Sequence, residues 1–394
     1  MTNTVLRIAM REWKWILENH RKFYLVLVAP LVCVAILGFV YSPKKVMGVP
    51  VLIVDQDHSA LSRELSRAIL ASETFSLGGY SDSSEEFPAL VAQDRVHLCL
   101  IFPHNLEKDV RARREAKVQV ILDASNILSG NAQAMSASNV LATFAVGVEV
   151  RTIEGETGIP GALAVNHAMP IETGMRAWFN PGFSSNYLNF LMIGLLTIYV
   201  QLAGLVVSAG AGVHEYRETR GNALAALTRN PWAFVAGKVL AYVAVIYPIS
   251  MIVVYMPHLF FGAPMRGSQV TLALVTLWFT AMLVTVGYAL SCVLADELFA
   301  TEICALITLP NFLLSGFTWP IFAMPPLLRG LAYGLPMYSY SFIYRKLSVM
   351  GASAEDCLRQ MTILSLWTVL AALFARYGTK QIVKANREVE HAHA

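Results

Sequence analysis

Three groups of ionisable residues in this sequence could do chemistry, and each suggests a different kind. Glu302 is an acid inside a long apolar run, where an ionisable side chain is costly and marks an ion or proton path by default. Asp55, Asp57 and His58 stand close enough together to suggest a metal site. A charged segment that begins at Glu215, directly after another apolar run, could be a surface helix that docks into a partner.

Each group also has a structural explanation. Asp and Ser oxygens stabilise turns and helix N-termini, so we expect Asp55, Asp57 and His58, between a strand and a helix, to cap rather than to bind a metal. Glu302 follows Asp296 by about one and a half helical turns, and the favoured interpretation is that it faces water or a partner helix. The charged segment could be an ordinary solvated loop.

The sequence excludes several classes of site. No GxxxxGK[ST] motif occurs, so no P-loop for ATP is present, and no nucleophile–base constellation is visible. We therefore expect no catalytic residue, no metal and no cofactor bound by this chain. The five cysteines lack CxxC and CxxH spacing, which argues against a disulfide framework or a zinc site. The net charge of +3 gives no reason to expect nucleic-acid binding.

The elements that must position these residues are membrane helices. The chain is 56% hydrophobic and 14% charged, whereas average globular chains are about 45–50% apolar and about 25% charged. About 20 apolar residues cross a bilayer as a helix. Six runs qualify as spans: 23–41, 187–210, 239–261, 270–294, 298–318 and 361–375.

Charged residues beside the spans predict the orientation. Arg7, Arg11 and Lys14 precede the first span, and the positive-inside rule therefore places the N-terminus in the cytoplasm. Six spans return the C-terminus to the same side, where Arg376 and Lys380 agree with it. The localisation expected is a cytoplasmic membrane crossed several times, with both termini cytoplasmic.

Two segments flank or interrupt the spans. Residues 4–20 have the pattern of an amphipathic helix, with Leu6, Met10 and Trp13 on one face, and a basic helix with tryptophans beside a span lies in the membrane interface. Residues 319–344 are apolar but contain Pro320, Pro325 and further prolines and glycines, which a straight spanning helix does not tolerate. We interpret them as a re-entrant pair of half-helices; a surface loop is the alternative.

The polar stretch 44–186 predicts a small mixed α/β domain outside the cytoplasm. Strands are expected at 49–54, 97–102 and 118–122, and helices at 59–71, 85–93, 105–112 and 131–153. The fold class predicted is an α-helical membrane protein with six transmembrane helices and this α/β domain. The segments are: an N-terminal amphipathic helix 1–22, a first span 23–43, the α/β domain 44–186, spans two to six 187–378 with a segment 213–231 and a re-entrant segment 319–344, and a cytoplasmic tail 379–394.

Three strings of residues resemble the type-2 ABC exporter permeases, a family with six spans and, in its bacterial members of this type, a large external domain. The string VDQDHSALSREL from Val54 is similar to the family's strand–turn–helix opening. The string EYRETRGNAL from Glu215, with a later Pro231, is similar to its cytoplasmic segment between spans two and three. The string LLSGFTWPI from Leu313, followed by Met324 and Pro325, is similar to its "LLSGF..PI..MP" string.

The resemblance implies roles for two sets of residues. It implies that separate ATPase subunits, which bind ATP and magnesium, dock on a coupling segment comprising Glu215, Tyr216, Arg217, Glu218, Arg220, Gly221, Leu224 and Leu227. It implies a gate or re-entrant corner comprising Ser315, Gly316, Phe317, Trp319, Pro320 and Pro325. Arg220 and Asn222 depart from the family's usual residues, which affects the detail of docking.

The function implied is an ATP-driven exporter that moves an amphipathic or hydrophobic, drug-like small molecule outward across a bacterial inner membrane. Implied partners are a second permease copy or a paralogue, membrane lipid, a periplasmic adaptor and an outer-membrane channel. Export of a lipid or a polysaccharide is an alternative. From other classes, an ion-coupled secondary carrier using Glu302 and a non-transporting membrane scaffold stay open.

Overall fold

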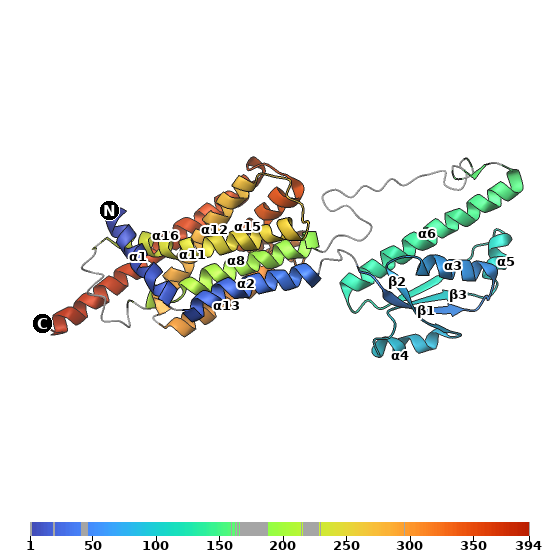
Figure 1. The fold of residues 1–394 in the computed structure, drawn as a ribbon, viewed down its shortest axis with the longest axis horizontal. Helices are drawn as coiled ribbons and strands as arrows, with labels where there is room; N and C mark the ends of the chain where they lie inside the picture. Colours follow the sequence, from blue (N-terminus) through green and yellow to red (C-terminus); the bar gives the residue numbers. More distant parts are fainter. Residues whose placement is uncertain are drawn as a thin grey trace. The chain divides into compact units, whose positions relative to one another are not determined.

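The computed structural model describes residues 2–18, 20–40, 46–158, 160–161, 163, 165, 188–213, 215, 228, 230–294 and 296–393. The chain forms two compact units (Figure 1). The first comprises Met1–Ser42 and Tyr187–Ala394, and the second is Pro43–Asn186. Each unit is described separately below.

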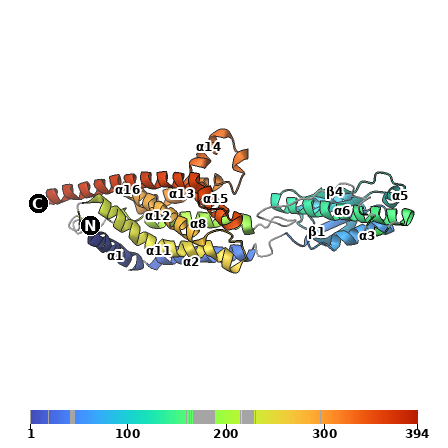
Figure 2. The same ribbon diagram turned by 90° about the horizontal axis from the view of Figure 1, so that it is seen from above.

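The first unit is a bundle of long helices (Figures 1 and 2). It contains α1 (Thr2–Glu18), α2 (His20–Val40), a π-helical turn (Leu188–Met192) leading into α8 (Ile193–Ser208), α11 (Pro231–Phe260), α12 (Gln269–Leu294), α13 (Glu297–Leu313), α14 (Pro326–Gly334), α15 (Pro336–Arg345) and α16 (Leu358–His393). Its core is apolar and lies between α8, α11, α12 and α15, with α16 packed along α12.

Four stretches of helix in the described part of the chain are long and apolar enough to cross a membrane: Asn189–Ser208, Pro231–Phe260, Gln269–Leu294 and Glu355–Lys384. A shorter apolar stretch, Leu31–Val40, belongs to α2. α13 has 17 residues. These helices confirm that the chain is a helical membrane protein, whereas the count of six spans stays a prediction.

Three helix boundaries differ from the sequence predictions. α11 begins at Pro231, where the Asn230 side chain accepts a hydrogen bond from the Trp232 N–H at 3.0 Å, so the prediction of a third span from residue 239 was eight residues too short. α13 ends at Leu313 instead of residue 318, because the chain turns there and Gly316 adopts φ +85°. A cytoplasmic tail was expected from residue 379, but α16 continues to His393 through Lys, Arg, Glu and Ala, which favour helix.

Residues 319–344 form two short helices rather than one. A 3₁₀ turn (Ile321–Ala323) precedes α14. α14 ends at Gly334, and α15 begins at Pro336 after the single residue Leu335. α15 is buried on most of its surface, whereas Ala332 is the buried residue of α14, which stands off the bundle in Figure 2. The broken helix pair is present, and its re-entrant position in a membrane stays a prediction.

The second unit is a four-stranded sheet with helices on both faces. The strands are β1 (Val49–Asp55), β2 (Phe75–Ser81), β3 (Leu98–Phe102) and β4 (Gln119–Leu122), in the order β2-β1-β3-β4. β1 is parallel to β2 and β3, and β4 is antiparallel to β3. The helices α3 (Ala60–Leu70), α5 (Leu106–Arg111) and α6 (Ile127–Thr157) contribute to the core on one face, and α4 (Phe87–Ala92) covers the other (Figure 1).

The sequence pattern predicts three strands, and β2 is a fourth that it does not indicate. Its sequence FSLGGYS contains two glycines and few of the branched residues that favour strands. It pairs with β1 through a register shift between Val51 and Leu52. A residue larger than Gly78 would meet the side chain of Val96, so this edge strand depends on close packing that no local pattern reveals.

Candidate functional site

A cluster of four charged side chains lies where α1, α11 and the turn after α8 meet. Arg11 and Glu12 come from α1, Lys238 from α11, and Glu215 from the chain just beyond the turn. Arg11 is paired with Glu215 and, at 2.9 Å, with Glu12. Lys238 Nζ lies 2.6 Å from Glu215 Oε1 and 2.8 Å from Glu12 Oε1. Two cations and two carboxylates make this charge cluster neutral.

Lys238 is fully satisfied although it is buried. An ammonium group has three donors, and the third bond of Lys238 goes to the Ala211 carbonyl oxygen at 2.8 Å. Its side chain is 0% exposed, and those of Glu12 and Glu215 are 6% exposed. A buried charge is tolerated only when it is paired and hydrogen-bonded. Lys238 therefore joins three separate segments at one atom.

Helix packing brings α1 and α11 close enough for these contacts. Ile8 of α1 is buried against Phe234 of α11. A side chain at Gly237 would place its Cβ 2.7 Å from Ile8 Cβ, so the helices can approach this closely only with glycine there. Lys238 follows Gly237 directly and faces the same junction. The close crossing of the two helices thus delivers Lys238 to Glu12.

The turn after α8 supplies the third segment. The Gly212 N–H donates to Ser291 Oγ of α12 at 2.7 Å, and the Glu215 N–H donates to the Gly212 carbonyl oxygen at 3.1 Å. Lys238 holds the Ala211 carbonyl in the same turn. The backbone of this turn is therefore hydrogen-bonded to both α11 and α12 before the chain reaches Glu215.

Glu215 is the first residue of the predicted coupling segment and the one that the structure describes within its named set. It is 5% exposed and belongs to the charge cluster. The others, Tyr216, Arg217, Glu218, Arg220, Gly221, Leu224 and Leu227, lie outside the described residues. The Glu215 carboxylate contacts other helices of this chain, and its role in coupling stays a prediction.

The electrostatics of the charge cluster favour the ionised form of Glu12. Burial of Glu12 raises the pKa of its carboxyl, but the charges and hydrogen bonds of Lys238 and Arg11 outweigh that effect and hold the pKa below its usual value. Glu12 lies on α1, outside the apolar helices. The pair Lys14 and Glu18 on the same helix is exposed and 3.9 Å apart, so it lacks this environment.

α1 has a second apolar face. Leu6, Met10 and Trp13, the face expected at the membrane interface, are each about half exposed. The face that packs on α11 carries Ile8 and Glu12 instead. One face of α1 therefore packs inside the protein, and the opposite apolar face is exposed on its surface.

The predicted gate residues divide into a buried and an exposed set. Phe317 is 6% exposed, and a side chain larger than Gly194 of α8 would collide with its ring. The guanidinium carbon of Arg345 lies 5.6 Å from the centre of the Phe317 ring, a cation–π contact. Ser315 is buried and donates to the Phe312 carbonyl oxygen at 2.6 Å.

The remaining gate residues lie on the surface or in the turn. Trp319 is 57% exposed, and Pro320 and Pro325 are exposed as well. Gly316 sits between the two sets with a left-handed backbone, φ +85°, which glycine adopts at little cost. The predicted corner is thus a packed hinge at Phe317 with an exposed flank at Trp319.

Glu302 lies in the second turn of α13 and is exposed on the surface of the chain. Among the described residues, none forms an ion pair with it. The structure does not bring Glu302 to the charge cluster or to the gate residues. A role of Glu302 in transport stays a prediction.

Of the residues considered for a metal in the α/β unit, Asp55 and Asp57 accept backbone hydrogen bonds in the turn before α3 and at the start of α5. Asp55 Oδ1 accepts from the backbone N–H groups of Asp57 and His58, and its Oδ2 accepts from Ser62. Ser59 accepts from the Ser62 N–H at the start of α3, and Asp57 accepts from the Glu107 N–H at the start of α5. No group of three His, Cys, Asp or Glu suited to a metal occurs in the described part of the chain.

Three residues of the charge cluster were missed as site residues: Arg11, Glu12 and Lys238. The sequence carried a signal for one of them, because Lys238 is a lone cation inside an apolar helix, where ionisable residues pair with others. Starting the third span at residue 239 excluded it. Arg11 and Glu12 look like ordinary members of a polar helix face, and only the fold identifies their partners.

The likeness to known proteins covers most of the chain. Residues 21–377 match the family described as ABC-2 family transporter protein. The probable multidrug ABC transporter permease YbhS of Escherichia coli (strain K12) is 20% identical over 356 residues, or 88% of this chain and 89% of that protein. The probable multidrug ABC transporter permease YbhR of the same strain is 22% identical over 364 residues, or 92% and 93%. With membrane-length apolar helices and a family match over most of its residues, the chain belongs to the ABC-2 family and is a permease subunit of an ABC transporter.

Proposed function

We propose that this permease transmits the movement of a separate ATPase subunit through residues 213–231, and that the charge cluster is the attachment of that segment to the membrane helices. One observation carries the proposal: Glu215, which belongs to this segment, is bound to Arg11 of α1 and Lys238 of α11. A displacement of the segment would therefore act on two helices at once, and through Gly212 and Ser291 on α12.

The cargo proposed is an amphipathic or hydrophobic small molecule moved outward. Two relatives over most of the chain are named as probable multidrug permeases, which supports this class over the alternative of a lipid or a polysaccharide. ATP and magnesium would bind to the partner ATPase.

The assembly proposed is a pair of permeases, formed by two copies or with a paralogue, in a bacterial inner membrane with both termini cytoplasmic. Membrane lipid would contact the exposed apolar faces, among them that of Leu6 and Trp13. One span after a cytoplasmic N-terminus would place the α/β unit on the far side, where a periplasmic adaptor and an outer-membrane channel would receive the cargo.

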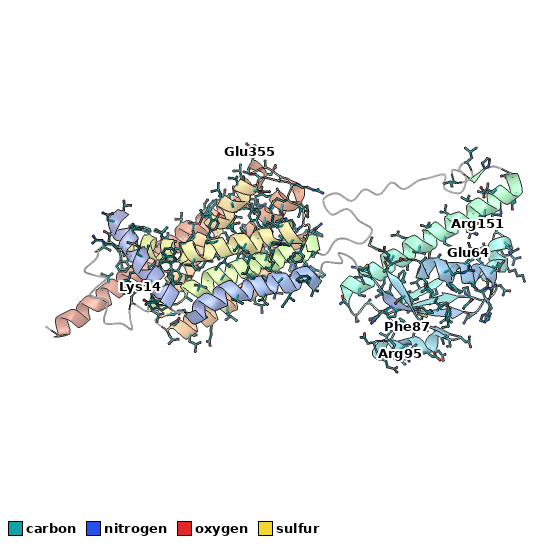
Figure 3. All side chains as sticks on the ribbon, viewed as in Figure 1. Lys14, Glu64, Phe87, Arg95, Arg151 and Glu355 are labelled. Carbon is teal, nitrogen blue, oxygen red and sulfur yellow. The ribbon has the colours of Figure 1, made fainter. Side chains whose placement is uncertain are left out.

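Docking is tested by site-specific cross-linking. A cysteine at Leu224 carrying a photoreactive maleimide is compared with one at Glu355, in the exposed turn before α16 (Figure 3). The tagged protein is irradiated in membranes of its host and the adducts are identified by mass spectrometry. We expect an ABC ATPase attached at position 224 and none at 355. An ATPase attached equally at both positions, or at neither, would refute docking on this segment.

Orientation is tested by the same strategy with a membrane-impermeant maleimide. Lys14→Cys should react only after the membrane is opened, and Glu355→Cys should react in intact spheroplasts. The five native cysteines are free, and four of them are buried, which keeps the background low. The reverse labelling pattern would overturn the proposed topology.

An ion-coupled carrier is the second candidate, because Glu302 is an exposed acid on a mostly apolar helix. Its test is cargo transport by proteoliposomes with Glu302→Gln, with and without the ATPase. Transport driven by a proton gradient without any ATPase, and abolished by Glu302→Gln, would favour the carrier. Transport that requires ATP and survives the substitution would favour the exporter. A chain that transports nothing under either condition would fit the scaffold.

A further inference from the structure

Several buried polar side chains of the helix bundle have no hydrogen-bond partner among the described residues, and two of them lie on α8 and α12, which pack on each other. Gln201 of α8 leaves both its amide oxygen and its amide nitrogen unpaired, and Thr280 of α12 leaves its hydroxyl unpaired. Both residues are 0% exposed. Buried polar groups in folded proteins are almost always satisfied by protein or by ordered water, so this pair requires an explanation.

The packing of α8 against α12 places the two residues opposite each other. A Cβ at Gly204 would lie 2.7 Å from Leu283 Cβ, and the Gly212 N–H bonds to Ser291, which is 79 residues later in the chain. Gly204 and Leu283 are separated by the same number of residues as Gly212 and Ser291. Ser208 and Gly287, which pack on each other, also have this separation. A constant offset means that the helices run parallel in a fixed register, and the same offset carries Gln201 to Thr280.

Helical periodicity puts both residues on the contact face. Gln201 precedes Gly204 by three residues and Ser208 by seven, and Thr280 has the same spacing from Leu283 and Gly287, so each lies on the stripe that touches the other helix. Their polar atoms therefore lie at the same height along the α8–α12 interface, called the seam below, but do not hydrogen-bond to each other.

The other polar residues of this seam are satisfied. Thr197 donates to the Ile193 carbonyl oxygen at 2.9 Å, and Ser208 donates to the Gly204 carbonyl oxygen at 2.6 Å. Thr276 lies one turn before Thr280 and its hydroxyl is 2.9 Å from that of Tyr340. Unpaired groups are therefore confined to one level of the seam, between two levels that are complete.

We propose that Gln201 and Thr280 form a buried hydration site that holds at least one ordered water molecule between α8 and α12. The amide oxygen, the amide nitrogen and the hydroxyl offer both acceptors and donors, and a buried water makes about three hydrogen bonds. Water suits the site better than a cation, because no carboxylate lies on this stripe of either helix.

A water molecule at this site would let α8 slide along α12 without breaking a direct side-chain hydrogen bond. A direct side-chain hydrogen bond must break when two helices slide, whereas a bridging water can exchange partners at small cost. α8 leads into the turn that holds Glu215, so a hydrated level lies on the helix that the coupling segment would move. The hydration site itself stands on the packing and does not depend on the function proposed above.

The test is radiolytic hydroxyl-radical footprinting of the full chain in lipid nanodiscs, without an ATPase. X-rays generate radicals from bound internal water, and these oxidise side chains beside it. Leu283 and Leu205 flank the site and are 3% and 2% exposed; Leu364 of α16 is 0% exposed and serves as the buried reference. We expect Leu283 and Leu205 to be oxidised several-fold faster than Leu364.

Matched variants assign the oxidation to these two residues. Gln201→Leu with Thr280→Val removes the polar atoms at nearly constant volume and should reduce the oxidation of Leu283 to that of Leu364. Thr285→Val is the control, because Thr285 is on the same helix and already donates to the Ala281 carbonyl oxygen at 2.7 Å. Thr280→Ser, which keeps the hydroxyl, should retain the oxidation.

Two results would overturn the proposal. One is oxidation of Leu283 and Leu205 no faster than that of Leu364 in the unmodified protein, a comparison that does not depend on any variant folding. The other is oxidation that persists in the folded double variant, which would assign the water to different groups.

Discussion

Lys238 Nζ and Glu215 Oε1 lie 2.6 Å apart and join two segments that the sequence separates by 23 residues. The contact ties a membrane helix to the first residue of the segment on which an ATPase is proposed to dock. Because Lys238 also holds Glu12 and the Ala211 carbonyl oxygen, the contact belongs to a junction of three segments and not to an isolated ion pair.

Removing the ammonium of Lys238 should destabilise the bundle strongly. In Lys238→Met the carboxylates of Glu12 and Glu215 face each other with Arg11 as their remaining partner. Breaking a buried ion pair costs about 3–5 kcal/mol, because the remaining charge is left uncompensated. Thermal unfolding of the purified protein should show a marked loss of stability.

Two further variants separate charge from side-chain volume. Lys14→Met removes an exposed lysine from α1, 79% exposed, and should leave the unfolding temperature nearly unchanged. Lys238→Met with Glu215→Gln restores neutrality and should recover part of the loss. Additive losses in the double variant would contradict the coupled cluster.

The stability of the junction should depend on pH through Glu12. Its pKa in the folded protein lies below the ordinary value of 4.5, since Lys238 and Arg11 outweigh the burial that raises it. The folded state therefore binds this proton less readily than the unfolded state, so the stabilisation is present above pH 4.5 and is lost as pH falls below it, through the folded pKa.

The pH effect is measured as the unfolding temperature from neutral pH downward through 4.5. Glu12→Gln should be less stable at neutral pH and should lose less on acidification. Glu18→Gln, at the exposed end of the same helix, is the matched control and should follow the unmodified protein. Equal acid sensitivity of Glu12→Gln and the unmodified protein would exclude Glu12 as the titrating group.

Asp55→Ala should loosen the start of α3 without any effect of metal removal. The substitution deletes the acceptor of two backbone N–H groups and of Ser62 Oγ, and loss of such a cap costs about 0.5–2 kcal/mol. Hydrogen exchange of the α3 amides should be faster, and a chelator should change nothing. Glu115→Ala, at a site 79% exposed, should not alter exchange. Destabilisation by the chelator would revive the metal hypothesis.

Phe317 and Trp319 should behave differently although only Thr318 lies between them. Phe317→Ala leaves a cavity against Gly194 and removes the ring beneath Arg345, and Phe→Ala in a packed core costs about 3–5 kcal/mol. Trp319→Ala removes an exposed side chain and should preserve the unfolding temperature. If Trp319 belongs to the gate, it should change cargo transport by folded protein. An equal loss of stability in both variants would argue against the division into hinge and flank.

Local patterns were sufficient where one short segment decides the structure. The strand at Val49–Asp55 followed by the capped helix Ala60–Leu70 could be predicted because a short apolar run, a turn and a Ser N-cap are local signals. The prolines of residues 319–344 predicted a broken helix for the same reason, since proline cannot continue a helical hydrogen-bond ladder.

Patterns failed where a partner distant in the sequence decides the structure. β2 forms a strand because its backbone pairs with the edge of β1, although the two glycines of β2 disfavour a strand. The inner face of α1 could not be distinguished from its outer face, because both carry apolar residues and only the packing on α11 shows which is buried.

The sequence by itself determined that this protein is a helical membrane permease, because long apolar runs and three family-like strings require no tertiary information. It did not determine how Glu215 is attached to the membrane helices. Lys238, Glu12 and Arg11 meet Glu215 only because Gly237 lets two helices cross closely and Ser291 holds the turn after α8. Charge pairing between distant segments is a property of the folded chain, so only the tertiary structure could decide it.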